Sequence, residues 1–108
     1  MPALRTVDIV VPVYNEEAAI GAFHELLCRA LQPLSYAFRI YYINDGSTDN
    51  TPQALQAIAD ADGRVVVIDL SRNFGHQAAL TAGMDLADAD FVITLDGDGQ
   101  HPPDMIAR

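Results

Sequence analysis

Four short runs of apolar residues, rich in β-branched side chains, recur along the chain between segments of mixed polarity. Each run has the length of a strand. Its near-continuous hydrophobic sequence is typical of a strand that is buried on both faces of a sheet. The expected strands are Val7 to Val13, Phe38 to Ile43, Val65 to Leu70 and Phe91 to Leu95. The pattern therefore predicts a sheet in the interior of the protein.

The segments between these runs show helical spacing of their apolar residues. One helix is expected around residues 20–31, a second begins at Thr51 with Pro52 in its first turn, and a third runs from about His76 to Leu86. Proline suits a first turn because its missing N–H would have no partner there. The residues expected to face the sheet are Ile20, Phe23, Leu27 and Leu31, then Leu55, Ile58 and Ala59, then Ala79, Leu80, Gly83 and Leu86.

The alternation of strands and helices predicts an α/β fold. Its economical form is a mostly parallel, Rossmann-like sheet with right-handed crossovers and helices on both faces. The 108 residues have the length of one small domain, and they contain no internal linker, repeat or low-complexity stretch. One core is therefore expected.

Composition narrows the range of partners. Hydrophobic residues make up 50% of the chain, and its formal charge of −9 comes with six Arg and no Lys. This charge argues against nucleic acid as a partner, and the missing Lys excludes a P-loop of the GxxxxGK type and a Schiff-base lysine. No run approaches the length of a membrane span, so this part of the protein is expected to be soluble and cytoplasmic.

The single cysteine, Cys28, rules out a disulfide framework and a cysteine-based zinc site within the chain. Because it stands among leucines, it is expected to be a small buried hydrophobic residue. His24, His76 and His101 are too dispersed along the sequence to suggest zinc binding. They are expected to be ordinary helix or loop residues.

A polar motif follows each expected strand. Parallel strands deliver their carboxyl ends to one edge of a sheet, and open α/β folds bind their ligands at that edge. The motifs are Tyr14-Asn15-Glu16-Glu17, Asn44-Asp45-Gly46-Ser47, Ser71-Arg72-Asn73-Phe74-Gly75 and Asp96-Gly97-Asp98-Gly99-Gln100. Each also has a structural interpretation: a helix cap for Asn15 and Glu16, a plain turn around Gly46, and salt bridging for Arg72.

The fourth motif is the sharpest chemical signal. Asp96 and Asp98 place two carboxylates close together at a strand end, and such pairs normally come with a cation or a raised pKa. With Gln100 as a third oxygen ligand, the set suits Mg²⁺ or Mn²⁺. A solvated acidic turn is the alternative, whereas an EF-hand is excluded because His101 replaces its glycine and Ala107 its bidentate glutamate.

An acidic edge would repel a nucleotide diphosphate unless a divalent cation screened the charge. A metal held by Asp98 and its neighbours could bridge the two phosphates and stabilise the leaving group as a Lewis acid. Asp45, on a different strand end, could accept hydrogen bonds from the base or the ribose.

Taken together, these motifs resemble the N-terminal signature of the family 2 inverting glycosyltransferases, which have the GT-A fold. The resemblance covers essentially the whole chain and rests on Val11 to Glu17, Asn44 to Thr51 and Asp96 to Asp98, in that order. Ser71 to Leu80 and Asp96 to Pro103 are similar to the branch that transfers sugars to polyprenyl phosphates.

The resemblance implies a nucleotide-sugar donor and a role for individual residues. Pro12, Tyr14, Glu16 and Asp45 would line the nucleoside pocket. The residues that would hold the diphosphate and a Mg²⁺ or Mn²⁺ ion are Asp96, Asp98 and Gln100, with Gly97 in the same nucleotide-binding loop. The family more often carries Ala or Val at position 97 and Leu at position 99, so the two glycines here would loosen that loop.

The resemblance also implies that residues 1–108 form the nucleotide-sugar-binding N-terminal half of one GT-A domain. The catalytic base would then lie beyond Arg108, and this stretch alone would be inactive. The full-length protein would use a polyprenyl phosphate acceptor at the cytoplasmic face of a membrane. Residues 1–108 alone would leave apolar surface uncovered on the sheet beside the fourth strand, which would favour a homo-oligomer.

Two other enzyme or signalling classes gather acids at strand ends. A receiver-like phosphoacceptor domain usually needs a lysine, which this chain lacks, and a phosphatase of the haloacid dehalogenase class has its Asp-x-Asp after the first strand, not the fourth. The alternative is a non-enzymatic domain, either a metal-dependent nucleotide-binding module or a receiver-like phosphoacceptor.

Overall fold

Strands and helices alternate along the part of the chain that the structure, a computed structural model, describes: residues 5–87 and 89–95. The elements are β1 (Thr6–Val13), α1 (Ile20–Leu31), β2 (Ala37–Asn44), α2 (Thr51–Ala61), β3 (Val65–Asp69), α3 (His76–Leu86) and β4 (Phe91–Thr94). The four strands and three helices expected between residues 7 and 95 are present.

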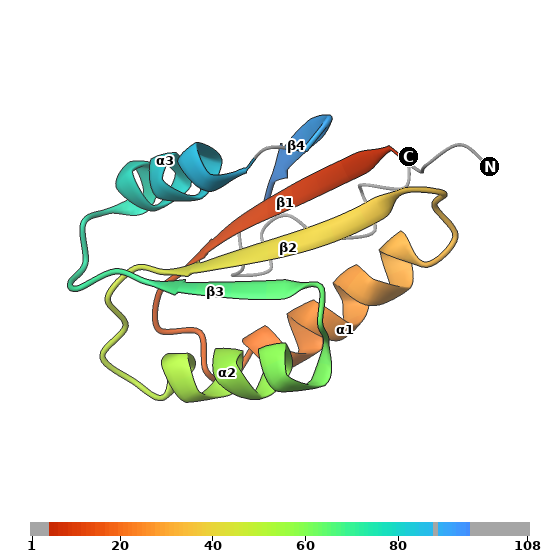
Figure 1. The fold of residues 1–108 in the computed structure, drawn as a ribbon. Coiled ribbons are helices and arrows are strands. Elements are labelled where there is room, and N and C mark those ends of the chain that lie inside the picture. Colours follow the sequence, from red (N-terminus) through yellow and green to blue (C-terminus); the bar gives the residue numbers. More distant parts are fainter. Residues whose placement is uncertain (1–4, 88, 96–108) are drawn as a thin grey trace.

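The strands form one sheet in the order β3-β2-β1-β4, and all the pairings are parallel. In the register of the sheet, Val10 of β1 lies opposite Tyr41 on one side and Thr94 on the other. Helices α1 and α2 cover one face of the sheet and α3 covers the other (Figure 1). The expected α/β fold, a mostly parallel Rossmann-like sheet with helices on both faces, is confirmed.

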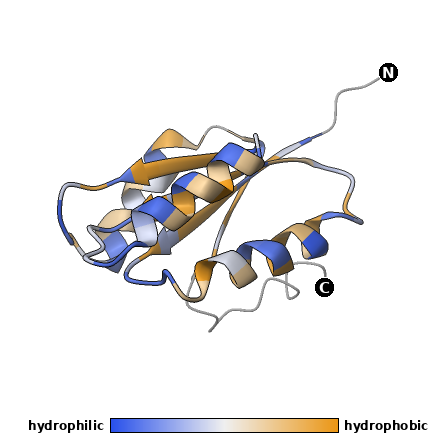
Figure 2. Ribbon diagram, turned by 90° about the horizontal axis from the view of Figure 1, so that it is seen from below, coloured by the Kyte–Doolittle hydropathy of each residue, from blue (hydrophilic) through white to orange (hydrophobic). Residues whose placement is uncertain are grey.

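The larger core lies between the sheet and the α1–α2 layer. Alternate residues of β1, among them Ile9 and Val11, point into it and meet Ile20 and Leu27 of α1. The helices alternate polar and apolar positions along their length, whereas the strands are mainly hydrophobic (Figure 2). This difference follows from burial, because the central strands are covered on both faces and the helices on one.

A smaller core lies on the opposite face, where Val10, Tyr41 and Ile43 meet Ala79 of α3. Gly83 brings α3 close to the sheet, since a Cβ at this position would overlap Val10 and crowd Ile43. The expectation that Leu86 faces the sheet is wrong: it is 56% exposed. The helix approaches the sheet through the small residues Ala79 and Gly83, and Leu86 is its last residue.

Among residues 5–87 and 89–95, no helix combines the length and the apolar character needed to cross a bilayer.

Candidate functional site

The loop after β1 is joined to the loop after β2 by hydrogen bonds of Asn15. Its backbone N–H donates to Ser47 Oγ at 3.0 Å, and its Oδ1 accepts from the backbone N–H of Thr48 at 2.8 Å. Asn15 has a φ of 52°, a left-handed conformation that asparagine tolerates better than most residues. Asn15 therefore bridges two strand ends, and it does not cap α1, whose N-cap is Ala19.

Thr51 links the same two loops from the start of α2, where its side chain is fully buried. Its hydroxyl oxygen accepts from the backbone N–H of Glu16 at 2.9 Å, and the hydroxyl also donates to Asp49 Oδ1. The second carboxylate oxygen of Asp49 accepts from the N–H of Glu17 at 3.4 Å. Desolvation works to raise the pKa of Asp49, but the hydrogen bonds from Thr51 and Glu17 outweigh it and lower the pKa.

Asp45 holds the loop after β3. Its side chain is buried, and its two carboxylate oxygens accept from the backbone N–H groups of Phe74 at 2.8 Å and Gly75 at 3.1 Å. Gly75 directly precedes α3, so the carboxylate lies at the N-terminus of that helix, where negative charge is favoured. A carboxylate offers about four lone-pair sites, so Asp45 keeps acceptor capacity beyond these two bonds.

Gly46 allows the loops after β2 and β3 to touch. It has a φ of 68°, and a Cβ here would overlap the backbone of Arg72 and Asn73. The Arg72 guanidinium lies over the Phe74 ring, 4.4 Å from its centroid, in a cation–π arrangement. The segment around Gly46 is thus a contact point between two loops as well as a turn.

The first three polar motifs therefore form one continuous surface, which we call the rim: residues 14–17, 45–51 and 71–75. Within or beside it, Pro12 is buried in β1, Tyr14 is 44% exposed and Glu16 is half-buried. Asp96, Gly97, Asp98 and Gln100 lie outside the described residues. Leu95, which precedes them, donates its backbone N–H to Val10 O at 3.0 Å, so β4 ends beside β1.

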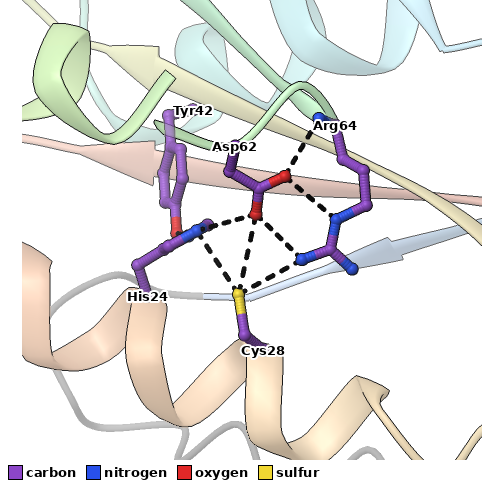
Figure 3. A network of polar contacts seen from close by, with 5 residues as sticks. All are labelled: His24, Cys28, Tyr42, Asp62 and Arg64. Carbon is purple, nitrogen blue, oxygen red and sulfur yellow. Dashed lines mark hydrogen bonds and ion pairs between the residues drawn. The ribbon is translucent and has the colours of Figure 1, made fainter. Parts of the chain in front are cut away.

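A second polar cluster lies near the amino end of β3, away from the rim. We call it the α1 cluster, and it consists of His24, Cys28, Tyr42, Asp62 and Arg64 (Figure 3). His24 Nδ1 is 2.7 Å from the Tyr42 hydroxyl, and its Nε2 is 3.2 Å from Asp62 Oδ2. Arg64 forms an ion pair with the same carboxylate at 2.8 Å.

Burial and charge shift the pKa values of the α1 cluster in different directions. Burial lowers the pKa of His24, although the hydrogen bond with Asp62 opposes this, so the imidazole tends to be neutral. Burial raises the pKa of the Cys28 thiol. Hydrogen bonds from Arg64 hold the pKa of Asp62 well below its usual range.

The expectation that Cys28 is an apolar core residue is wrong. The residue is half-buried, and its sulfur lies 3.4 Å from His24 Nε2 and 3.3 Å from Arg64 Nη2. Leu26 and Leu27 were a poor guide, because in a helix the side chains that share a face are three or four positions apart. The spacing of His24 and Cys28, four residues apart on α1, was the signal that could have revealed the cluster.

Comparison with known proteins links the chain to sugar transferases. Residues 8–108 match the model of glycosyl transferase family 2. The chain is 43% identical over 99 residues to the uncharacterized glycosyltransferase YkcC of Bacillus subtilis, covering 92% of this chain and 31% of that protein. It is 45% identical over 103 residues to the undecaprenyl-phosphate 4-deoxy-4-formamido-L-arabinose transferase of Pseudomonas paraeruginosa, covering 94% of this chain and 30% of that protein.

Solved structures show the same fold. The mannosyltransferase PcManGT from Pyrobaculum calidifontis, in complex with GDP-Man and Mn²⁺, superposes with a TM-score of 0.76 at 23% identity, covering 98% of this chain and 31% of that one. TarS residues 1–349 from S. aureus, in complex with UDP, gives a TM-score of 0.69 at 25% identity, covering 86% of this chain and 27% of that one.

Proposed function

The chain belongs to glycosyl transferase family 2, and we propose that its rim binds a nucleotide diphosphate sugar, the donor of a glycosyl transfer reaction. The observation that carries this proposal is the joining of three strand-end loops by part-buried hydrogen bonds into one polar surface. Preorganised polar groups at the carboxyl edge of a parallel sheet are the usual setting for nucleotide binding in open α/β folds. The names of two solved neighbours include GDP-Man and UDP.

In this proposal Pro12, Tyr14, Glu16 and Asp45 line the nucleoside pocket. The exposed part of Tyr14 is available to a flat base, and Glu16 extends from a backbone that Thr51 holds in place. Asp45 is fixed in orientation by Phe74 and Gly75, and its unused lone pairs are suited to a base or ribose donor.

In the same proposal, Asp96, Asp98 and Gln100 bind the diphosphate and a divalent cation. Gly97, between the two aspartates in the sequence, contributes to nucleotide binding. Their oxygen ligands suit Mg²⁺ or Mn²⁺, and the chain has no lysine to meet the phosphates. When bound, the metal would neutralise charge on the departing nucleoside diphosphate. The complex of the mannosyltransferase neighbour with Mn²⁺ supports metal use in this fold.

The acceptor proposed for the whole protein is a polyprenyl phosphate. The support is the undecaprenyl-phosphate transferase among the relatives, of which this chain covers 30%. A lipid acceptor would bring the whole protein to a membrane surface. The catalytic base would come from residues that follow Arg108.

The donor proposal is tested by calorimetric titration of the protein with GDP and UDP in Mn²⁺ and in EDTA. Binding is expected to require the metal, and Asp98→Ala is expected to weaken it at least tenfold, or by about 1.4 kcal/mol. Asp85→Asn, which removes an exposed carboxylate on α3, is the matched control and should bind normally. Equal affinity in EDTA and Mn²⁺ would reject the metal-dependent mode of binding.

A further inference from the structure

Three side chains of different chemistry converge in the α1 cluster, away from the rim. His24 and Cys28 come from successive turns of α1, and Asp62 comes from the connection between α2 and β3 (Figure 3). His24 Nε2, Cys28 Sγ and Asp62 Oδ2 lie within 4.8 Å of one another. The three separations are 3.2 Å from nitrogen to oxygen, 3.4 Å from sulfur to nitrogen and 3.7 Å from sulfur to oxygen.

These separations can be compared with the ligand spacing around zinc. A tetrahedral zinc ion at its usual bond lengths holds a nitrogen and an oxygen ligand about 3.3 Å apart, and a sulfur ligand about 3.5 Å from either. The three atoms of the α1 cluster already form a triangle of nearly that size. We propose that His24, Cys28 and Asp62 form a zinc site that ties α1 to the connection between α2 and β3.

Two neighbouring groups orient the ligands. The Tyr42 hydroxyl oxygen is 2.7 Å from His24 Nδ1, and in the tautomer in which Nδ1–H donates a hydrogen bond to that oxygen, the lone pair of Nε2 faces the other two ligands. Asp62 Oδ1 accepts from the backbone N–H and from Nε of Arg64, each at 3.0 Å. Asp62 Oδ2 is thereby directed toward His24 and Cys28.

The guanidinium of Arg64 occupies the position at which the α1 cluster would bind a metal cation. Its Nη2 lies 2.8 Å from Asp62 Oδ2 and 3.3 Å from Cys28 Sγ, so one cationic group already contacts two of the three ligands. The Arg64 side chain is 43% exposed, so its guanidinium can turn toward solvent as one planar unit, while the backbone N–H of Arg64 keeps its bond to Asp62 Oδ1. A divalent ion would replace Nη2, the Cys28 thiol would release its proton to solvent, and water would complete the tetrahedron.

The ligand set selects the metal. Thiolate and imidazole ligands favour zinc, whereas Mg²⁺ and Mn²⁺ prefer carboxylate, carbonyl and water oxygens. The site therefore differs in chemistry and in position from the metal proposed at the rim. It also reverses the exclusion drawn from the presence of one cysteine, because a site with one Cys, one His and one Asp needs no second cysteine.

The test uses protein freed of metal with EDTA and then kept in Mg²⁺, which occupies oxygen-ligand sites. Titration with Zn²⁺ is expected to show one site per chain. Zinc at roughly a hundredfold excess over its Kd should raise Tm by several degrees. Co²⁺ in place of zinc should give a thiolate-to-cobalt charge-transfer band in the near ultraviolet, which reports directly on Cys28.

Cys28→Ala is expected to weaken zinc binding roughly tenfold or more, to abolish the charge-transfer band and to remove the zinc-dependent rise in Tm. Glu25→Gln, an exposed position on the same helix, is the matched control and should leave all three unchanged. Zinc binding of equal affinity in Cys28→Ala would overturn the proposal. So would a cobalt complex of the unmodified protein without a thiolate band, whether or not the variant folds.

Discussion

The Thr51 hydroxyl makes two hydrogen bonds at the rim, which valine, a residue of the same shape without a hydroxyl, could not make. Its hydroxyl accepts the backbone N–H of Glu16 and donates to Asp49, so one fully buried side chain fixes the loops after β1 and β2. Buried polar groups of this kind are costly to leave unpaired. The Thr51 hydroxyl thus supplies the buried part of the link between these two loops, which the hydrogen bonds of Asn15 reinforce nearer the surface.

Thr51→Val keeps the volume of the side chain and removes both hydrogen bonds. We expect the free energy of unfolding to fall by about 1–3 kcal/mol, because the N–H of Glu16 loses its partner in a part-buried position. Urea denaturation measures the change. Thr81→Val, which removes an exposed hydroxyl bonded to Gln77 on α3, is the control and should change stability by less than about 0.5 kcal/mol. Equal losses in the two variants would contradict the role given to Thr51.

Gly46→Ala should disturb the rim more severely. Its φ of 68° disfavours any residue with a Cβ, by about 1–2 kcal/mol, and the new methyl group would meet backbone of Arg72 and Asn73 that cannot turn aside. We expect a loss of stability above about 2 kcal/mol and weaker binding of a nucleotide diphosphate. Gly63→Ala, with open space around it, is the control for both measurements. A Gly46→Ala protein as stable as the control would show that the two loops can separate freely.

For individual site residues, the sequence predicted the strand end at which each one lies, but it did not predict their hydrogen-bond partners. The motif around Asp45 was placed at the rim because parallel strands share an edge. The partners of Asp45 are Phe74 and Gly75, and the partner of His24 is Asp62, 38 positions away. Such pairs depend on the tertiary packing of helices and loops, which the local pattern of apolar and polar residues does not determine.

At the scale of elements, the central strands β1 and β2 were predictable because most of their residues are buried on both faces. β1 is buried at every position from Val7 to Val13, and this continuous burial produced the apolar run. The start of α2 was equally clear, since Thr51 and Pro52 begin the helix as expected. The inward face of α3 was predicted correctly at Ala79 and Gly83, which are buried, and wrongly at Leu86, the exposed last residue of the helix.

Because α3 packs closely against the sheet, we expect Gly→Ala substitutions to change the stability of the protein in opposite directions at positions 83 and 21. Gly83→Ala gains about 1 kcal/mol in helix propensity, but its methyl group overlaps Val10 and crowds Ile43, and overpacking costs about 1–3 kcal/mol. We expect a net loss of stability. Gly21→Ala in α1, where the new Cβ meets nothing within 4 Å, should instead stabilise the protein by up to about 1 kcal/mol. Thermal unfolding of both variants tests the contrast, and stabilisation by both would show that α3 can move away from Val10.

Across the whole molecule, polar chemistry divides between two regions of the sheet. Oxygen-rich loops form the rim at the carboxyl ends of the strands, whereas the α1 cluster near the amino end of β3 brings nitrogen, sulfur and oxygen ligands together. The strands that separate the two regions are among the most buried parts of the chain. Substitutions in one region are therefore expected to leave ligand binding in the other unchanged.

The described sheet also has an apolar edge at β4. This strand pairs with β1, and its residues Phe91 and Val92 are 48% and 40% exposed. An exposed edge strand with apolar side chains offers unpaired backbone groups and a hydrophobic surface to a second chain. We expect the 108-residue polypeptide on its own to self-associate as its concentration rises, which sedimentation velocity would detect.

Val92→Lys should shift this self-association to higher concentration, because a charge on an edge strand opposes pairing with another strand. The matched control is Val66→Lys on β3, the strand at the other end of the sheet order, where the native side chain is 37% exposed. If the contact forms through β4, the control should associate like the unmodified polypeptide. A monomer at every concentration would contradict the prediction, and equal effects of the two lysines would attribute association to charge alone and not to the β4 edge.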